Sequence, residues 1–185
     1  EHGQPLHAFD FDKVEGNKII VRNANLKERF TTLDNKERLL DSSMLVISDS
    51  KSSIGLAGIM GGTKCEVDGS TKSIILESAN FNQSVIRKTS STLKLRTEAS
   101  YRFERGLRVE LTEPALLRAT SLINEICGGK VSKGKIDINF EKFNYEPIVL
   151  TSKHVSKVLG VEIDSSKIES ILISLGFTIA DKNIE

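Results

Sequence analysis

RTEASYRFERG, residues 96–106, concentrates three arginines, two glutamates and two aromatic side chains in eleven positions. The small residues Ala99 and Ser100 stand between large ones, and small side chains leave room beside them. The stretch therefore predicts one wall of a pocket. Close packing against a neighbouring strand is the alternative, and in that case Arg102 and Arg105 are simply exposed.

Strand patterns dominate the chain before this stretch. Runs rich in Val and Ile, bounded by polar turn formers, predict strands within residues 17–24, 44–50, 53–60 and 72–78. Between the first two runs, FTTLDNKERLL (30–40) carries Asp34-Asn35 at its centre, which indicates a hairpin. The first half of the chain is thus predicted to be β-rich.

Helix patterns begin at Asn82, a good capping residue, and predict a short helix over residues 82–95. A stronger pattern covers residues 109–129, with Pro114 near its start and Gly128-Gly129 at its end. Residues 130–147 alternate Ile136, Ile138 and Phe140 with polar residues, which predicts a last strand and a linker.

Two further short helices are expected at residues 151–160 and 164–177, the second capped by Asp164. The predicted fold class is α/β of the α+β kind, with a β-rich domain and packed helices over residues 1–143. A small, partial helical domain follows over residues 147–185, since about forty residues rarely fold alone. The chain has no initiator methionine, and we interpret it as a piece of a longer protein.

Composition restricts the partners. The 26 basic and 25 acidic residues nearly cancel, but between Arg87 and Arg108 there are seven basic residues against two acidic ones. This local excess suits contact with phosphates, or is a solvated face. Cys65 and Cys127 fit no metal spacing and make a poor disulfide framework, so a cytoplasmic location is expected. No apolar run reaches the 18 or so residues of a membrane span, so no membrane partner is expected.

Glycines cluster in GLAGIMGG (55–62), but neither common nucleotide-loop pattern fits. The absence of Cβ atoms lets a ligand approach the backbone closely, and a tight turn is the other explanation. No pair among His2, His7 and His154 has a zinc-helix spacing, so no metal site is predicted.

Two ionisable residues are candidates for a site. His7 stands in QPLHAFDFD beside Asp10 and Asp12, which either orient it or are surface residues, and a structural histidine is the simpler reading. Glu77 ends SIILE, whose apolar residues predict a strand buried on both faces. A carboxylate there is costly unless it is paired or lies at a cavity. An ion pair with a nearby arginine is the alternative.

The residues alone therefore predict a pocket built from the ends of Leu6–Phe9 and Ala57–Gly62, from Glu77, and from Thr97–Ser100. Five motifs add a resemblance: GQPLHAFD, LAGIMGG, ILESANF, IRKTSSTLKLRTEASYRFERG and EICGG. Their order and spacing resemble the editing domain in the β subunit of bacterial phenylalanyl-tRNA synthetase, over residues 3–140. Residues 147–180 resemble the start of the next domain of that subunit, a small helical module of proposed nucleic-acid-binding type.

The resemblance implies hydrolysis of the ester that joins tyrosine, wrongly attached, to the terminal adenosine of tRNA(Phe). A hydrophobic synthetic pocket discriminates weakly against an analogue that merely adds a hydroxyl, so a second site is needed. By the resemblance, Glu77 recognises the tyrosine hydroxyl and His7 positions the substrate. The other residues that match the family's binding residues are Ala57, Gly58, Thr97 and Ala99, and Arg102 and Arg105 are expected to contact tRNA.

The parent enzyme implied by the resemblance is an α2β2 heterotetramer that binds tRNA(Phe) and uses ATP and magnesium on its α subunit. No cofactor is expected in this fragment. The family's segment before GQPLHAFD also contributes to the pocket, so this chain alone is expected to have weak activity or none. Tyr101 stands where a histidine is common in the family.

Two alternatives remain at this point. The first is a non-catalytic module that helps to assemble the synthetase and contacts tRNA through its basic stretch. The second is an unrelated hydrolase that uses His7 with an aspartate, although no serine elbow or activated cysteine spacing supports it.

Overall fold

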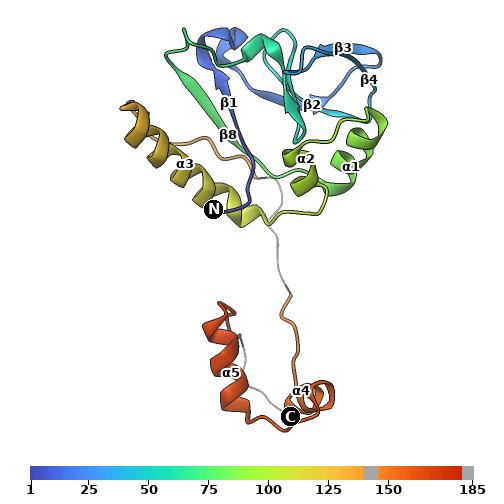
Figure 1. Cartoon of the computed structure of the whole chain (residues 1–185), viewed down its shortest axis with the longest axis vertical. Helices are drawn as coiled ribbons and strands as arrows, with labels where there is room; N and C mark the ends of the chain where they lie inside the picture. The colour runs from blue at the N-terminus through green and yellow to red at the C-terminus, as the bar shows by residue number, and fades with distance from the viewer. Residues whose placement is uncertain (140–145, 181–185) are drawn as a thin grey trace. The chain divides into compact units, whose positions relative to one another are not determined.

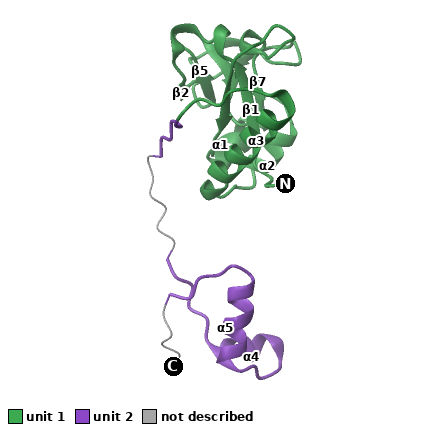
Figure 2. Ribbon diagram, turned by 90° about the vertical axis from the view of Figure 1, so that its left-hand side faces the viewer, with its two compact units in different colours: residues 1–133 green, residues 134–185 purple. Residues whose placement is uncertain are grey.

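The computed structural model describes residues 1–139 and 146–180. The chain divides into two units, residues 1–133 and 134–185, and each is described by itself (Figure 2). The domain boundary expected from the sequence lies at residue 143, and residues 134–139 contain no helix or strand.

The first unit contains eight strands in three antiparallel groups (Figure 1). Four of them form a sheet in the order β2-β5-β6-β7, while β1 pairs with β8 and β3 with β4. Their bounds are β1 Leu6–Asp10, β2 Ile20–Asn23, β3 Glu28–Thr31, β4 Glu37–Leu40, β5 Leu45–Ser48, β6 Ser53–Leu56, β7 Met60–Gly61 and β8 Ile74–Ser78. The predicted strands at residues 17–24, 44–50 and 72–78 and the predicted hairpin are confirmed.

The strand expected within residues 53–60 is confirmed only over Ser53–Leu56, because a turn then separates β6 from β7. Gly58 has φ of +65°, a left-handed conformation that suits glycine. The Ile59 N–H donates to the Leu56 carbonyl at 3.0 Å and closes the turn. The chain therefore reverses at Ala57 and Gly58 instead of continuing as a strand.

Three helices complete this unit: α1 Gln83–Thr92, α2 Glu98–Phe103 and α3 Thr112–Cys127. The Asn82 side chain accepts from the N–H groups of Ser84 and Val85, as predicted for a cap. Gly128 ends α3 in the left-handed conformation, also as predicted. Short 3-10 helices occupy Phe11–Lys13, Glu15–Asn17, Thr63–Cys65 and Val109–Leu111.

The core of this unit is formed by apolar side chains from the strands and from the segments around α1 and α2. Its largest fully buried members are Phe9, Leu40, Met44, Ile54, Leu56 and Ile86. Helix α3 packs against β8, where the Ser78 hydroxyl donates to the Thr112 carbonyl at 2.7 Å. This mixture of strands and helices confirms the α+β class.

The second unit contains α4 Ser152–Leu159 and α5 Ser165–Ser174. Thr151 caps the first helix and Asp164 the second, so both predicted helices are confirmed. The strand expected from Ile136 and Ile138 is wrong, because both side chains are exposed and no neighbouring strand pairs with residues 134–139. Phe140 lies outside the described residues.

Candidate functional site

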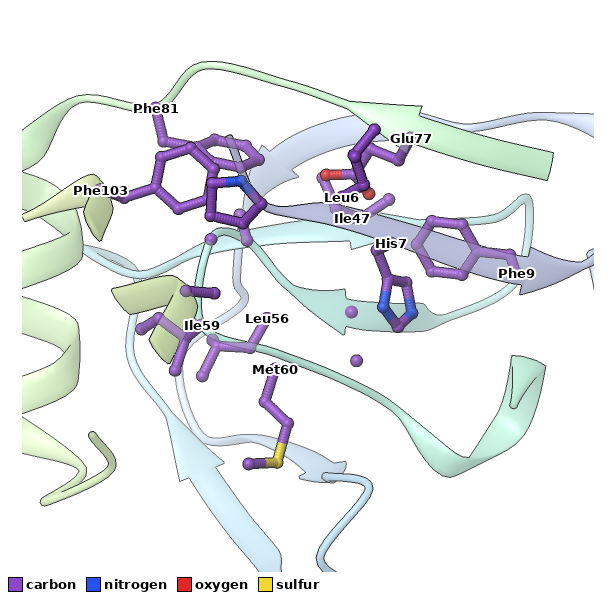
Figure 3. Close-up of a pocket in the computed structure, with 16 residues that line it drawn as sticks. Leu6, His7, Phe9, Ile47, Leu56, Ile59, Met60, Glu77, Phe81 and Phe103 are labelled. Carbon is purple, nitrogen blue, oxygen red and sulfur yellow. The ribbon is translucent and has the colours of Figure 1, made fainter. Parts of the chain in front are cut away.

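A pocket in the first unit brings together most of the residues expected to form a site (Figure 3). Its walls are the β1–β8 ribbon, the turn between β6 and β7, and helix α2. His7, Ala57, Gly58, Glu77 and Ala99 all line it. The cavity measures about 70 Å³, and the rest of its lining is almost entirely apolar.

His7 and Glu77 are direct neighbours across the β1–β8 ribbon. The antiparallel register pairs His7 with Glu77 and Phe9 with Ile75. Side chains directly opposite in such a pair lie on the same face, with Cβ atoms about 4.5–5.5 Å apart. The ribbon therefore places both ionisable side chains on the pocket side, although 70 residues separate them in the sequence.

The Glu77 side chain has no ion pair or hydrogen bond with any residue that the structure describes, so the alternative of an ion pair with an arginine is wrong. Burial raises the pKa of this carboxyl to about 7. The strand itself is not buried on both faces, because Ile74 is 40% exposed.

His7 is held by packing rather than by a carboxylate. Its ring meets Phe9 edge to face, with centroids 4.5 Å apart, and burial lowers the pKa of the imidazole. Asp10 lies on the opposite face of β1 and binds Thr71 Oγ1 at 2.6 Å. Asp10 therefore does not orient His7, an alternative that the sequence left open, and a histidine–aspartate hydrolase loses that support. At neutral pH the imidazole is uncharged.

Two glycines give the pocket its shape. A Cβ atom at Gly58 would come within 2.9 Å of Phe81 and Ile86. A Cβ atom at Gly61 would come within 2.5 Å of His7 Nε2. Real Cβ atoms do not approach neighbours so closely, so both positions require glycine as the side chains now stand. Gly61 therefore sets where the imidazole can lie.

Sequence reasoning missed the aromatic wall. Phe81 and Phe103 line the pocket and meet edge to face, with centroids 5.0 Å apart. The sequence contained a signal for both aromatic residues. Phe81 ends the ILESANF segment that holds Glu77, and Phe103 follows Ala99 by one helical turn.

Thr97 lies beside the pocket and does not line it. Its hydroxyl donates to the Ile59 carbonyl at 2.8 Å and accepts from the Ser100 N–H at 3.0 Å. Ser100 Oγ in turn accepts from the Thr97 N–H, which completes a capping box. Thr97 thus fastens the start of α2 to the β6–β7 turn and thereby holds Ala99 against the cavity.

A family model described as the B3/4 domain matches residues 1–128. The chain belongs to the B3/4 domain family. Similar curated proteins are phenylalanine–tRNA ligase β subunits. The one from Carboxydothermus hydrogenoformans is 45% identical over 186 residues, covering 100% of this chain and 23% of the relative. The one from Dehalococcoides mccartyi strain 195 is 48% identical over 171 residues, covering 91% and 21%.

The chain thus spans less than a quarter of the length of these relatives. An N-terminal fragment of the phenylalanyl-tRNA synthetase β subunit from Pyrococcus horikoshii is 17% identical, with a TM-score of 0.45. That match covers 96% of this chain and 51% of the other. The sequence relatives confirm the resemblance read from the five motifs.

The two arginines expected to contact tRNA lie on the outer side of this B3/4 domain. Arg102 is 3.8 Å from Glu98, and its side chain is 47% exposed. The Arg105 guanidinium lies over the Tyr101 ring, 3.5 Å from the centroid, and also binds Glu104. Neither side chain enters the pocket.

The glycine cluster of the B3/4 domain does not form an open cradle for a nucleotide. A Cβ atom at Gly62 would meet the Phe30 ring at 2.7 Å, and Gly61 is covered by His7. These residues therefore do not fit the phosphates of ATP. Among the described residues no group of three His, Cys, Asp or Glu side chains could hold a metal ion. In the same residues no helix is long and apolar enough to cross a membrane.

Proposed function

We propose that this B3/4 domain is the editing part of a phenylalanine–tRNA ligase β subunit, and that it hydrolyses the ester of tyrosyl-tRNA(Phe). The observation that carries the proposal is Glu77, a buried carboxyl without a partner among the described residues, which faces an otherwise apolar pocket. A buried polar group of this kind costs stability, so its presence calls for a ligand that satisfies it.

The dimensions of the pocket suit the side chain of tyrosine. The cavity of about 70 Å³ is well above the roughly 10–15 Å³ that a single water needs. It therefore has room for a group of several atoms, such as part of a small ring. Phe81 and Phe103 provide aromatic contacts for the ring, and the Glu77 carboxyl bonds the hydroxyl.

Phenylalanine fills the same space and leaves Glu77 without a partner. An unsatisfied buried group costs about 1–3 kcal/mol, and a charged one costs more. This difference is the basis of selectivity for the tyrosyl ester. This selectivity complements the aminoacylation site of the parent enzyme, where a hydrophobic pocket discriminates only weakly against an added hydroxyl.

The chemistry of the lining supports direct attack by water. Among the residues that the structure describes, His7 and Glu77 are the only ionisable side chains that line this pocket, and none of its lining residues is a serine, threonine or cysteine. With Glu77 assigned to the hydroxyl, the neutral His7 imidazole positions the ester by hydrogen bonding. Rate enhancement then comes mainly from the orientation of water and ester, a source that can supply several kcal/mol.

The remaining proposals concern the parent enzyme. Its α subunit, in an α2β2 heterotetramer, carries out aminoacylation with ATP and magnesium in the cytoplasm, and this chain takes no part in binding them. tRNA(Phe) is the shared substrate. Residues 147–185 would contribute a helical module next to the editing domain.

Deacylation of tyrosyl-tRNA(Phe) tests the function, with phenylalanyl-tRNA(Phe) as the control ester. The comparison uses this chain, the full β subunit in complex with its α partner, and both with Glu77→Ala. We expect the parent complex to hydrolyse the tyrosyl ester and to leave the phenylalanyl ester intact. The Glu77→Ala complex should no longer distinguish the two esters. If the variant complex edits as well as the parent, the pocket assignment is wrong and a non-catalytic assembly module becomes the better description.

A further inference from the structure

Helix α2 carries a second feature on the side that faces away from the pocket. Ala99 and Phe103 are one helical turn apart and face the cavity, whereas Tyr101 lies between them in sequence and faces the other way. A surface hollow of about 380 Å³ lies there. It is lined by Arg96, Thr97, Glu98, Ser100, Tyr101 and Glu104.

Tyr101 lines this hollow, and the Arg105 guanidinium forms a flat, preformed stack with its ring. The tyrosine is 54% exposed, and the Arg105 guanidinium lies 3.5 Å from the centroid of its ring. Arg105 Nη1 also donates to the Tyr101 carbonyl at 2.6 Å and to Glu104 Oε1 at 3.0 Å. Three contacts therefore fix the guanidinium, so little conformational entropy remains to be lost when a ligand binds.

The charge around the stack is positive on balance. Glu104 is paired with Arg105, and Glu98 lies 3.8 Å from Arg102. Arg96 is exposed and has no ion pair with any described residue. The hollow therefore offers a cation beside an exposed aromatic ring, which are the two components that bind single-stranded nucleic acid without reading its sequence.

We propose that the Tyr101–Arg105 stack binds a nucleobase of single-stranded RNA, from a nucleotide that precedes the terminal adenosine. The inference rests on the proposed function, because the terminal ester occupies the pocket. A helix with its side chains is about 10–12 Å wide, so a base on the outer side of α2 belongs to a different nucleotide from the adenosine whose aminoacyl group fills the pocket. Bases stack on tyrosine rings and on guanidinium planes, and Arg96 neutralises an adjacent phosphate.

Binding of an uncharged RNA tests this inference without any hydrolysis. A fluorescently labelled single-stranded RNA ending in CCA is titrated with this chain, and anisotropy gives the affinity. Tyr101→Ala should weaken binding about tenfold, whereas Tyr101→Phe, which keeps the ring, should bind within about twofold of the parent. Because the side chain is exposed, thermal unfolding should show both variants folded.

A matched control separates stacking from charge. Arg105→Ala and Arg108→Ala each remove one positive charge from the same segment, but the Arg108 side chain is 74% exposed and lies outside the stack. Arg105→Ala should weaken binding more than Arg108→Ala at the same salt concentration.

The proposal is overturned if the two arginine variants weaken RNA binding equally and Tyr101→Ala does not weaken it. That result would mean that the surface binds RNA only through its positive charge. An equal loss in Tyr101→Phe and Tyr101→Ala would also overturn the proposal. Adenosine monophosphate serves as a second probe, and its affinity should be the same for the parent and Tyr101→Ala. A loss there would assign the stack to the terminal base instead. None of these measurements involves an ester. RNA binding by the stack can therefore be found even if the editing assay fails, and editing can be found even if the stack does not bind RNA.

Discussion

Replacing Glu77 by glutamine should stabilise the protein, and by an amount that depends on pH. The carboxyl has a pKa of about 7 in the folded protein against an ordinary value of 4.5, and burial is the cause. Between these two pH values the native state holds a proton that the unfolded state has lost. Stability therefore falls as pH rises through this window, and the loss is complete above pH 7.

The size of the effect follows from the two pKa values. Their difference is about 2.5, and each unit corresponds to 1.36 kcal/mol, so ionised Glu77 costs about 3 kcal/mol of unfolding free energy at pH 8. At pH 5 the cost is below about 1 kcal/mol. Glutamine carries no charge at either pH. The variant should therefore melt about 10 °C above the parent at pH 8 and only a few degrees above it at pH 5.

Thermal unfolding followed by circular dichroism at pH 5, 6, 7 and 8 measures this difference. Glu98→Gln is the matched control, because it makes the same chemical change at a side chain that is 90% exposed. Its melting temperature should differ from that of the parent by a small, constant amount. If Glu77→Gln raises the melting temperature by the same amount at every pH, or is less stable than the parent at pH 8, then Glu77 is not a desolvated carboxyl.

Three other predictions concern the walls of the pocket. Gly61→Ala should lower the free energy of unfolding by about 1–3 kcal/mol and slow deacylation, because the new methyl group displaces His7. The control is Gly129→Ala, whose methyl group meets no neighbour within 4 Å, so no stability should be lost by steric conflict. Matching unfolding curves for these two alanine variants would contradict the assigned contact. Thr97→Val should lower stability in urea by about 1 kcal/mol, while Thr97→Ser keeps the hydroxyl and should behave like the parent. The ratio of tyrosyl to phenylalanyl deacylation should rise from pH 6 to pH 8 as Glu77 ionises, and the same ratio in Glu77→Gln should not change with pH.

Local chemistry explains why most elements were predictable. Asn82 and Asp164 cap their helices with their own side chains, and Gly128 ends α3 by a conformation that suits glycine. Such signals need no knowledge of the rest of the fold. The same local rules failed at Ile136 and Ile138, where an alternating pattern found no strand to pair with among the described residues. A strand requires a partner that the pattern itself cannot supply.

The composition of the pocket was predictable, but its contacts were not. The motifs named His7, Glu77 and Ala99 as pocket residues, and all three line the cavity. The alternative of an ion pair for Glu77 was wrong because the ribbon turns this side chain toward the pocket, whereas Arg102 and Arg105 do not enter it. The close approach of Gly61 to His7 depends on how β7 lies against β1, which is a tertiary relation that no sequence spacing expresses.

The β1–β8 ribbon also has a consequence for biosynthesis. A nascent chain that has emerged only as far as β7 already contains β1, which carries His7, and the turn between β6 and β7. Strand β1 nevertheless has no hydrogen-bonding partner until β8 follows. Such contacts between distant segments form late and slowly compared with local ones. The cavity is therefore among the last parts of the first unit to be assembled during translation, and a chain truncated before Glu77 lacks the carboxyl on which the proposed selectivity depends.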